Sequence, residues 1–99
     1  MTYYIYSLSV GKRKPIYIGI TRNNLQVRLK QHRNNCFRKT KISNQKIYIL
    51  LRKLGITKSN FLKKVKIKIL KKTNAENRFK DEVKFRKKMK PVGNSDTMS

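Results

Sequence analysis

The chain has 99 residues, enough for one domain with a modest core. Lysine and arginine number 27 against four acids, a formal net charge of +23, so nucleic acid is the expected partner. The apolar residues are spread over several short segments, which disfavours a membrane span and a basic peptide that acts on membranes. Cys36 is the single cysteine, which excludes an internal disulfide, and it lacks the companions of a zinc site.

The first part of the chain predicts a β-hairpin, a helix and a loop. Residues 3–10 and 16–20 are rich in aromatic and β-branched side chains and flank a turn segment that contains glycine and proline. Asn23 or Asn24 can cap a first helix that extends to about residue 33. Helical spacing is shown by Leu25, Leu29 and His32. The basic stretch 33–43 has no periodicity and is predicted to be a loop.

The second part predicts a helix, a strand and a last helix. Ser43 or Asn44 can cap the second helix and Gly55 can end it. Its apolar face comprises Ile47, Leu50, Leu51 and Leu54. Residues 61–70 alternate as in a half-exposed strand, with Val65, Ile67 and Ile69 on one face and Lys64, Lys66 and Lys68 on the other. Residues 75–90, capped by Thr73 or Asn74 and ended by Pro91, predict the last helix, and 95–99 a flexible tail. The predicted order is β-β-α-α-β-α.

One acid of the last helix is out of pattern. On a helical wheel, Glu82 falls inside the arc of apolar residues that consists of Phe79, Val83, Phe85 and Met89. Glu76 and Asp81 fall at the edges of that arc, where solvated acids belong. A carboxylate on a core-facing side is costly unless it is paired or binds a metal. Glu82 is therefore either a metal ligand or half of a structural ion pair.

The first helix carries two further candidates. Arg28 and His32 are four residues apart beside the apolar stripe, so both can point into the same cleft. The alternative reading is a hydrogen-bonded structural histidine and an ordinary phosphate contact.

The motifs as a whole resemble the GIY-YIG nucleases. Tyr4-Ile5-Tyr6, ten intervening residues and Tyr17-Ile18-Gly19 are similar to the paired tripeptides that name this family. The resemblance continues through Thr21, Leu25, Arg28 and His32, and ends with Glu82, Pro91 and Asn94. It covers residues 3–94, and we take residues 1–94 as the nuclease domain. It implies an α+β fold, with a small three-stranded antiparallel sheet flanked by three helices.

Two positions depart from the family pattern. Tyr4 stands where glycine is usual, although the tyrosine at the third position, Tyr6, is kept. The excision-repair branch has a lysine three residues after its second motif tyrosine. Here that position is Ile20, so such a role passes to Arg22, to Lys30 or to no residue.

The resemblance implies a DNA endonuclease with a one-metal mechanism. Glu82 would hold one Mg²⁺ or Mn²⁺, since a single carboxylate with waters can suffice. Tyr17 would activate the attacking water if the positive field lowered its phenol pKa towards neutrality, with Tyr6 as its partner. The other assigned catalytic residues are Arg28 on the phosphate oxygens, His32 in the water-activating network and Asn94 near the metal or its supporting backbone.

Other readings remain open at this point. Tyr6 and Tyr17 can be simple cross-strand aromatics, and Asn94 beside Gly93 can be turn chemistry. The chain as a whole can be a non-catalytic nucleic-acid-binding module, either a decayed nuclease or a ribosomal-type protein.

The expected partner is DNA rather than a membrane, and the expected state a monomer or weak dimer. The basic residues assigned to nucleic-acid binding are Arg22, Lys30, Arg33, Arg38, Lys39 and Lys41. We expect a cytoplasmic protein, in a bacterial or phage-infected cell. The richness in lysine, asparagine and isoleucine is typical of an AT-rich genome such as that of a phage or mobile element.

Overall fold

A computed structural model describes residues 2–12 and 14–94, so the predicted tail at 95–99 lies outside the described residues. Its elements in chain order are β1 (Thr2–Val10), β2 (Tyr17–Thr21), α1 (Leu25–Cys36), the 3-10 helix η1 (Lys41–Asn44), α2 (Lys46–Lys53), α3 (Phe61–Lys64), β3 (Val65–Asn74) and α4 (Arg78–Met89). None of the helices in these ranges has the length and apolarity needed to span a lipid bilayer.

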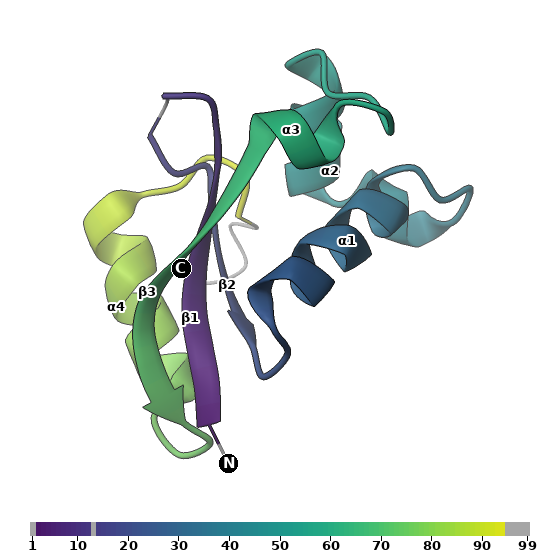
Figure 1. Cartoon of the computed structure of the whole chain (residues 1–99). Helices are drawn as coiled ribbons and strands as arrows, with labels where there is room; N and C mark the ends of the chain where they lie inside the picture. The colour runs from purple at the N-terminus through teal and green to yellow at the C-terminus, as the bar shows by residue number, and fades with distance from the viewer. Residues whose placement is uncertain (1, 13, 95–99) are drawn as a thin grey trace.

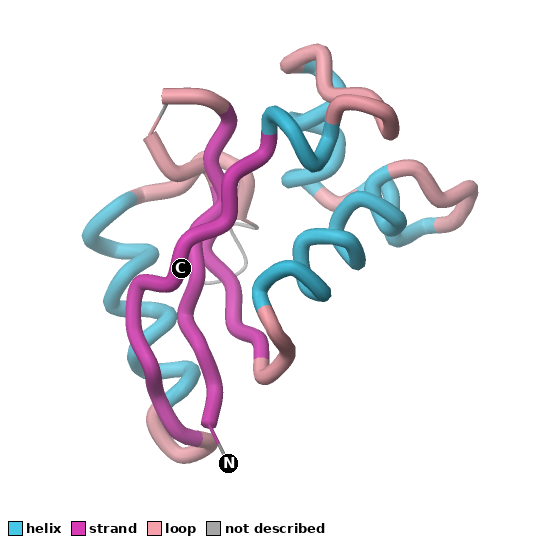
Figure 2. The backbone as a smooth tube through the Cα atoms, viewed as in Figure 1, coloured by secondary structure: helices cyan, strands magenta, loops and turns pink. Residues whose placement is uncertain are grey.

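The three strands form one antiparallel sheet in the order β2-β1-β3. Helix α4 lies on one side of the sheet, and α1, α2 and α3 lie on the other (Figures 1 and 2). The predicted α+β fold and its order are therefore confirmed, with η1 and the one-turn α3 as additions. Because β2 is an edge strand, residues from the helices on both faces of the sheet can meet beside it.

The core fills the space between the sheet and α1–α3. Its buried members are Tyr6, Leu8, Ile16, Leu29, Cys36, Ile47, Tyr48, Leu51, Ile56, Phe61 and Val65. Phe61 explains why the third strand begins later than predicted: residues 61–64 form a helical turn that places this ring in the core. Cys36 is also buried, so α1 continues beyond residue 33 and shortens the predicted loop.

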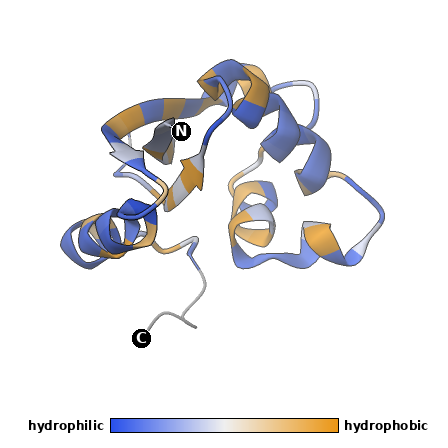
Figure 3. Cartoon of the chain, turned by 90° about the horizontal axis from the view of Figure 1, so that it is seen from below, coloured by the Kyte–Doolittle hydropathy of each residue, from blue (hydrophilic) through white to orange (hydrophobic). Residues whose placement is uncertain are grey.

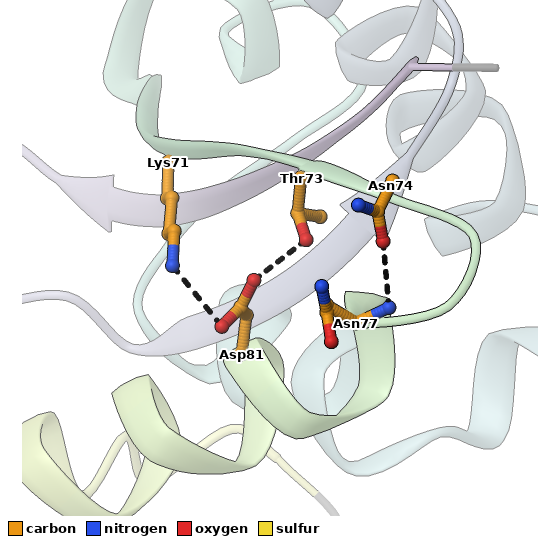
Figure 4. Close-up of polar contacts among 5 residues, drawn as sticks. All are labelled: Lys71, Thr73, Asn74, Asn77 and Asp81. Carbon is orange, nitrogen blue, oxygen red and sulfur yellow. Dashed lines mark hydrogen bonds and ion pairs between the residues drawn. The ribbon is translucent and has the colours of Figure 1, made fainter.

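The predicted helix caps are confirmed only in part. The Asn24 side chain accepts a hydrogen bond of 2.8 Å from the Gln26 amide at the start of α1. Gln45 occupies the N-cap position of α2 without a side-chain bond, so the prediction of Ser43 or Asn44 was wrong. Helix α4 starts three residues later than predicted, after Asn77, and the Asn74 side chain accepts from the Asn77 amide at 2.8 Å (Figure 4).

A β-bulge divides β3 into two parts with opposite facing. The register between β1 and β3 shifts between Ile5 and Tyr6, which pair with Lys71 and Ile69 respectively. One extra residue on β3 reverses the side-chain alternation, since successive residues of a strand face opposite sides. Before the bulge the odd-numbered residue Val65 faces the core. After it, Lys71 faces α4 instead.

This reversal creates the anchor of α4. Asp81 is buried, with 8% of its surface exposed, and accepts hydrogen bonds from Thr73 at 2.6 Å and from the Lys71 ammonium at 3.2 Å (Figure 4). The bond from Thr73, together with Lys71, lowers the pKa of the Asp81 carboxyl despite its burial. The prediction that Asp81 is a solvated acid was therefore wrong.

The buried face of α4 is rotated from the predicted arc. Phe79 is 60% exposed, and its ring contacts the Arg78 guanidinium. The residues of α4 that are buried or half-buried are Arg78, Asp81, Glu82, Val83, Phe85, Arg86 and Met89. Glu82 stays within this face, as predicted.

We expect Asp81→Ala to lower the melting temperature by several degrees, because it leaves Thr73 and Lys71 without their shared acceptor. Glu76→Ala, which removes an exposed acid just before α4, is the matched control. Thermal unfolding followed by circular dichroism measures both variants. Equal melting temperatures for the two would contradict the anchoring role.

Candidate active site

The site begins with the contact between Tyr6 and Gly19, which pair across β1 and β2. A Cβ atom on residue 19 would lie 2.5 Å from the Tyr6 hydroxyl oxygen and 2.8 Å from the Tyr17 ring. Glycine is thus required where the Tyr6 side chain crosses the neighbouring strand. The ring centroids of Tyr6 and Tyr17 are 6.3 Å apart.

The buried Tyr6 hydroxyl joins β1 to α1. The Arg28 Nε donates to it at 3.1 Å, and its oxygen lies 2.7 Å from His32 Nε2. A guanidinium has only donors, so the Tyr6 oxygen accepts from Arg28, and His32 Nε2 is the acceptor that lies within reach of the buried Tyr6 proton. We therefore assign this proton to the bond with His32. His32 Nδ1 then carries the ring proton and donates it to the Tyr48 hydroxyl, 2.8 Å away.

His32 is a positioning residue in this network. It is 1% exposed, and both ring nitrogens are used by tyrosine hydroxyls. Burial, with the charge of Arg28, lowers the pKa of His32 to about 3, so the ring is neutral. The structure joins it to Tyr6 and Tyr48 rather than to solvent, which argues against its expected place beside an attacking water.

A pocket of about 370 Å³ lies at the edge of the sheet beside β2. Tyr17 from β2, Glu82 and Arg86 from α4, and Ile47 from α2 are among the residues that line it. Figure 3 again shows α4 on one side of the view and α1 to α3 on the other, as in Figure 1, so the pocket takes its lining residues from both sides of the sheet. The Glu82 carboxylate lies 3.7 Å from the Arg86 guanidinium, one helical turn away.

Asn94 reaches the same pocket but uses its amide on the backbone. Its Oδ1 accepts from the Ile18 N–H and its Nδ2 donates to the Ile18 carbonyl, both at 2.8 Å. The Gly93 N–H donates to the Ile16 carbonyl at 2.6 Å. Of the two expected roles for Asn94, the geometry matches the support of the backbone beside the pocket.

Burial dominates the titration of both candidate reactive groups. It raises the pKa of Tyr17, and the nearby Arg28 and Arg86 lower that pKa by less. The condition set for Tyr17, a phenol pKa that falls towards neutrality, is therefore not met by the protein's own charges. Burial also raises the pKa of Glu82, against a lowering effect of Arg86.

The donor set of the pocket fits a single-carboxylate metal site. Within 2–12 and 14–94, histidine, cysteine, aspartate and glutamate do not form any cluster of three that could hold a metal. Asp81, adjacent to Glu82, is occupied by Thr73 and Lys71. One carboxylate with water ligands suits Mg²⁺, which keeps several waters when it binds protein, and does not suit a site made wholly of side chains.

The basic residues assigned to nucleic-acid binding lie mostly on the surface. Those exposed are Arg22, Lys30, Arg38, Lys39 and Lys41, and Arg33 is half-buried in the last turn of α1. Arg52 holds the segment between α1 and α2 from inside, since its guanidinium donates to the carbonyls of Cys36 at 2.6 Å and Ser43 at 2.8 Å. The sequence analysis did not single out this structural role of Arg52.

Tyr48 is the site residue that the sequence analysis missed. It is 2% exposed, and its hydroxyl bonds to His32. The signal lay in its position next to Ile47 and three residues before Leu51 on the same helix, because a buried tyrosine needs a partner for its hydroxyl.

We expect acid to destabilise the protein through His32. The unfolded ring takes up a proton below its ordinary pKa of 6.5, whereas the folded ring stays neutral down to about 3. Stability from this residue is therefore present above pH 6.5 and is lost as the pH falls towards 3. Melting temperatures at pH 7.5 and pH 5 measure this loss, and the melting temperature of His32→Gln should fall less between the two pH values than that of the wild type. An equal fall in the wild type and the variant would refute this.

A comparison with protein-family models identifies residues 2–90 as a GIY-YIG catalytic domain. Searches of curated proteins and of solved structures gave no match. The matched segment contains Tyr6, Tyr17, Arg28, His32 and Glu82, and it ends before Asn94. The match covers nearly all of the 99 residues, and the three-stranded sheet with its helices agrees with it. The chain therefore belongs to the GIY-YIG family of nucleases.

Proposed function

We propose that this chain hydrolyses phosphodiester bonds of DNA, with one divalent metal ion held by Glu82. The observation that carries the proposal is the meeting of Tyr17 from β2 and Glu82 from α4 in one pocket. Arg28 lies close enough to influence the pKa of Tyr17. The residues that we propose for water activation, metal binding and phosphate binding thus come from three elements, β2, α4 and α1.

The distribution of charge supports DNA as the substrate. All four acids lie at or after residue 76, so the layer formed by α1, α2 and α3 carries cations without any carboxylate. This layer presents a uniformly positive surface to a phosphate backbone. Glu82 is on α4, on the other side of the sheet from this surface, and it approaches the α1–α3 layer at the pocket beside β2.

Each residue of the site has a distinct task in the proposed reaction. Arg28, whose planar guanidinium suits phosphate, would neutralise charge that develops on the non-bridging oxygens. Tyr6 and His32 hold that guanidinium in place through the hydrogen bonds described above. Tyr17, once deprotonated, would accept a hydrogen bond from the attacking water and take up its proton.

The role of Tyr17 would depend on the metal ion, because the Tyr17 hydroxyl has to lose a proton that burial holds in place. Burial keeps its hydroxyl protonated in the protein alone. Mg²⁺ or Mn²⁺ at Glu82 would supply positive charge that neutralises phosphate and lowers the pKa of nearby oxygen groups. We therefore expect the reaction to depend on both residues together.

A non-catalytic DNA-binding module is the second candidate. The ion pair of Glu82 with Arg86 is the observation that favours it, because a purely structural carboxylate has such a partner. This candidate predicts DNA binding without cleavage, and the metal experiment below separates the two.

We expect Glu82→Gln to abolish the nicking of supercoiled plasmid in Mg²⁺ while DNA affinity stays nearly unchanged. Glu76→Gln is the matched control, since it removes the same charge from an exposed position just before α4 and should cleave like the wild type. Gel analysis with Mg²⁺ and with excess chelator measures nicking. Undiminished cleavage by the wild type in chelator would rule out the metal-dependent mechanism.

We expect Tyr17→Phe to lower the single-turnover cleavage rate by about a hundredfold, the order of a lost general base. The ring and its packing are kept, so the melting temperature should change little. Because the phenol must give up its proton, the wild-type rate should rise with pH between 7 and 9, and that rise should be absent from the variant.

Tyr3→Phe is the control for this experiment, because Tyr3 lies on the face of the sheet that carries α4 and contacts Arg78. It should keep the wild-type rate and the wild-type pH profile. A Tyr17→Phe variant that cleaves at the wild-type rate would show that Tyr17 is only a packed aromatic.

A further inference from the structure

A groove of about 610 Å³ lies beside α1 and shares no lining residue with the Tyr17 and Glu82 pocket. Its lining includes Arg28, Gln31, Asn34, Phe37, Arg38 and Lys58. These residues come from α1, from the segment that follows it and from the turn before α3. The groove is thus built by parts of the chain that are distant in sequence.

Arg28 connects this groove to the reaction centre. Its Nε donates to the Tyr6 hydroxyl at 3.1 Å, and its Nη1 donates to the Gln31 side-chain oxygen at 3.0 Å. The Arg28 guanidinium is therefore held between the Tyr6 hydroxyl and Gln31, and both Arg28 and Gln31 line the groove. Because Arg28 itself lines the groove, a strand whose phosphate it bound would have an adjoining nucleotide beside the groove.

The chemistry of the groove suits both parts of a nucleotide. Arg38 and Lys58 are exposed cations from two segments, and no acid lines the groove. Gln31 and Asn34 are three residues apart on α1, so their amides lie on one face of the helix. The Gln31 oxygen accepts from Arg28, and the Asn34 oxygen accepts from Arg33 at 3.4 Å. Each amide keeps its N–H donors and a second lone pair on its oxygen, and a donor beside an acceptor is the combination that reads the edge of a base.

We propose that this groove binds the nucleotide next to the cleaved bond, with its phosphate on Arg38 and Lys58 and its base edge on Asn34 and Gln31. The position of the cut then depends on one flanking base, while affinity still comes mainly from phosphate contacts. This inference rests on the proposed nuclease function for the base preference. The phosphate contacts can be tested by binding alone.

The phosphate contacts are tested with Arg38→Gln/Lys58→Gln against Lys66→Gln/Lys68→Gln. The control pair removes the same charge from exposed residues of β3 that pair with Ser9 and Ser7. Binding to a short duplex is measured over a range of salt in chelator. The groove pair should reduce the slope of log K against log salt by about 1.8, from about 0.9 per phosphate, and the control pair should reduce it by much less. Equal effects of the two pairs would overturn the phosphate site.

The base contact is tested with Asn34→Ala, a change at an exposed residue. Cleavage of duplexes randomised around the cut, read by sequencing of the products, gives the preference at each flanking position. The wild type should favour one base at one flanking position, adenine being the partner that suits an amide, and the variant should lose this preference by several-fold at an unchanged salt slope. A preference unchanged by Asn34→Ala would overturn the base contact.

The two measurements separate this proposal from the proposed function. If the wild type does not cleave in Mg²⁺, the nuclease proposal fails and the base contact fails with it, whereas the salt slopes in chelator still decide the phosphate site. If the wild type cleaves but the groove pair behaves like its control, the groove proposal fails alone.

Discussion

The single proton of the Tyr6 hydroxyl is the constraint on which the site depends. Arg28 can only donate, and His32 Nε2 is the acceptor within reach of this buried proton. Its assignment to His32 also fixes which nitrogen of His32 carries hydrogen and the direction of the Tyr48 bond. Four residues from β1, α1 and α2 thereby have one consistent arrangement, and no buried side-chain oxygen or nitrogen in the described ranges lacks a partner. The Arg28 guanidinium is thereby positioned by the buried side chains of Tyr6 and His32. Gly19 makes the arrangement possible by leaving room for the tyrosine.

Two adjacent acids on α4 have different roles: Asp81 attaches the helix to β3, and Glu82 lines the pocket. A helix turns by about 100° per residue, so Asp81 and Glu82 face different surroundings. Asp81 is held by Thr73 and Lys71 of β3, while Glu82 lines the pocket beside β2 at the other edge of the sheet. The bonds of Asp81 fix how α4 is placed and rotated against the sheet, and so fix the position of Glu82. The bulge in β3 contributes to this attachment, since it turns Thr73 and Lys71 towards α4.

Much of this could be predicted because strand alternation, glycine stops and the paired tripeptides are local signals. The hairpin was predicted from such signals, the Asn24 cap from the preference of asparagine for the start of a helix, and the inward placement of Glu82 from the helical wheel. The exposure of Phe79 and the burial of Asp81 were not, because the helical wheel ranks faces by hydropathy. The true face of α4 is set by its partners on β3 beyond a bulge that leaves no signal in the alternation of lysines. Tyr48 was missed for a related reason, since its partner lies in another helix.

The bonds of Gly93 and Asn94 to β2 have a consequence for solubility as well as geometry. An edge strand presents unpaired backbone groups that can recruit a strand from another molecule. The Asn94 amide occupies the N–H and the carbonyl of Ile18 as a neighbouring strand would, and Gly93 occupies the Ile16 carbonyl. A side chain there would collide with Ile16, so only glycine lets the chain lie this close. The segment after α4 thus covers backbone groups that another strand could otherwise pair with, and it does so at the rim of the pocket that Tyr17 and Glu82 line.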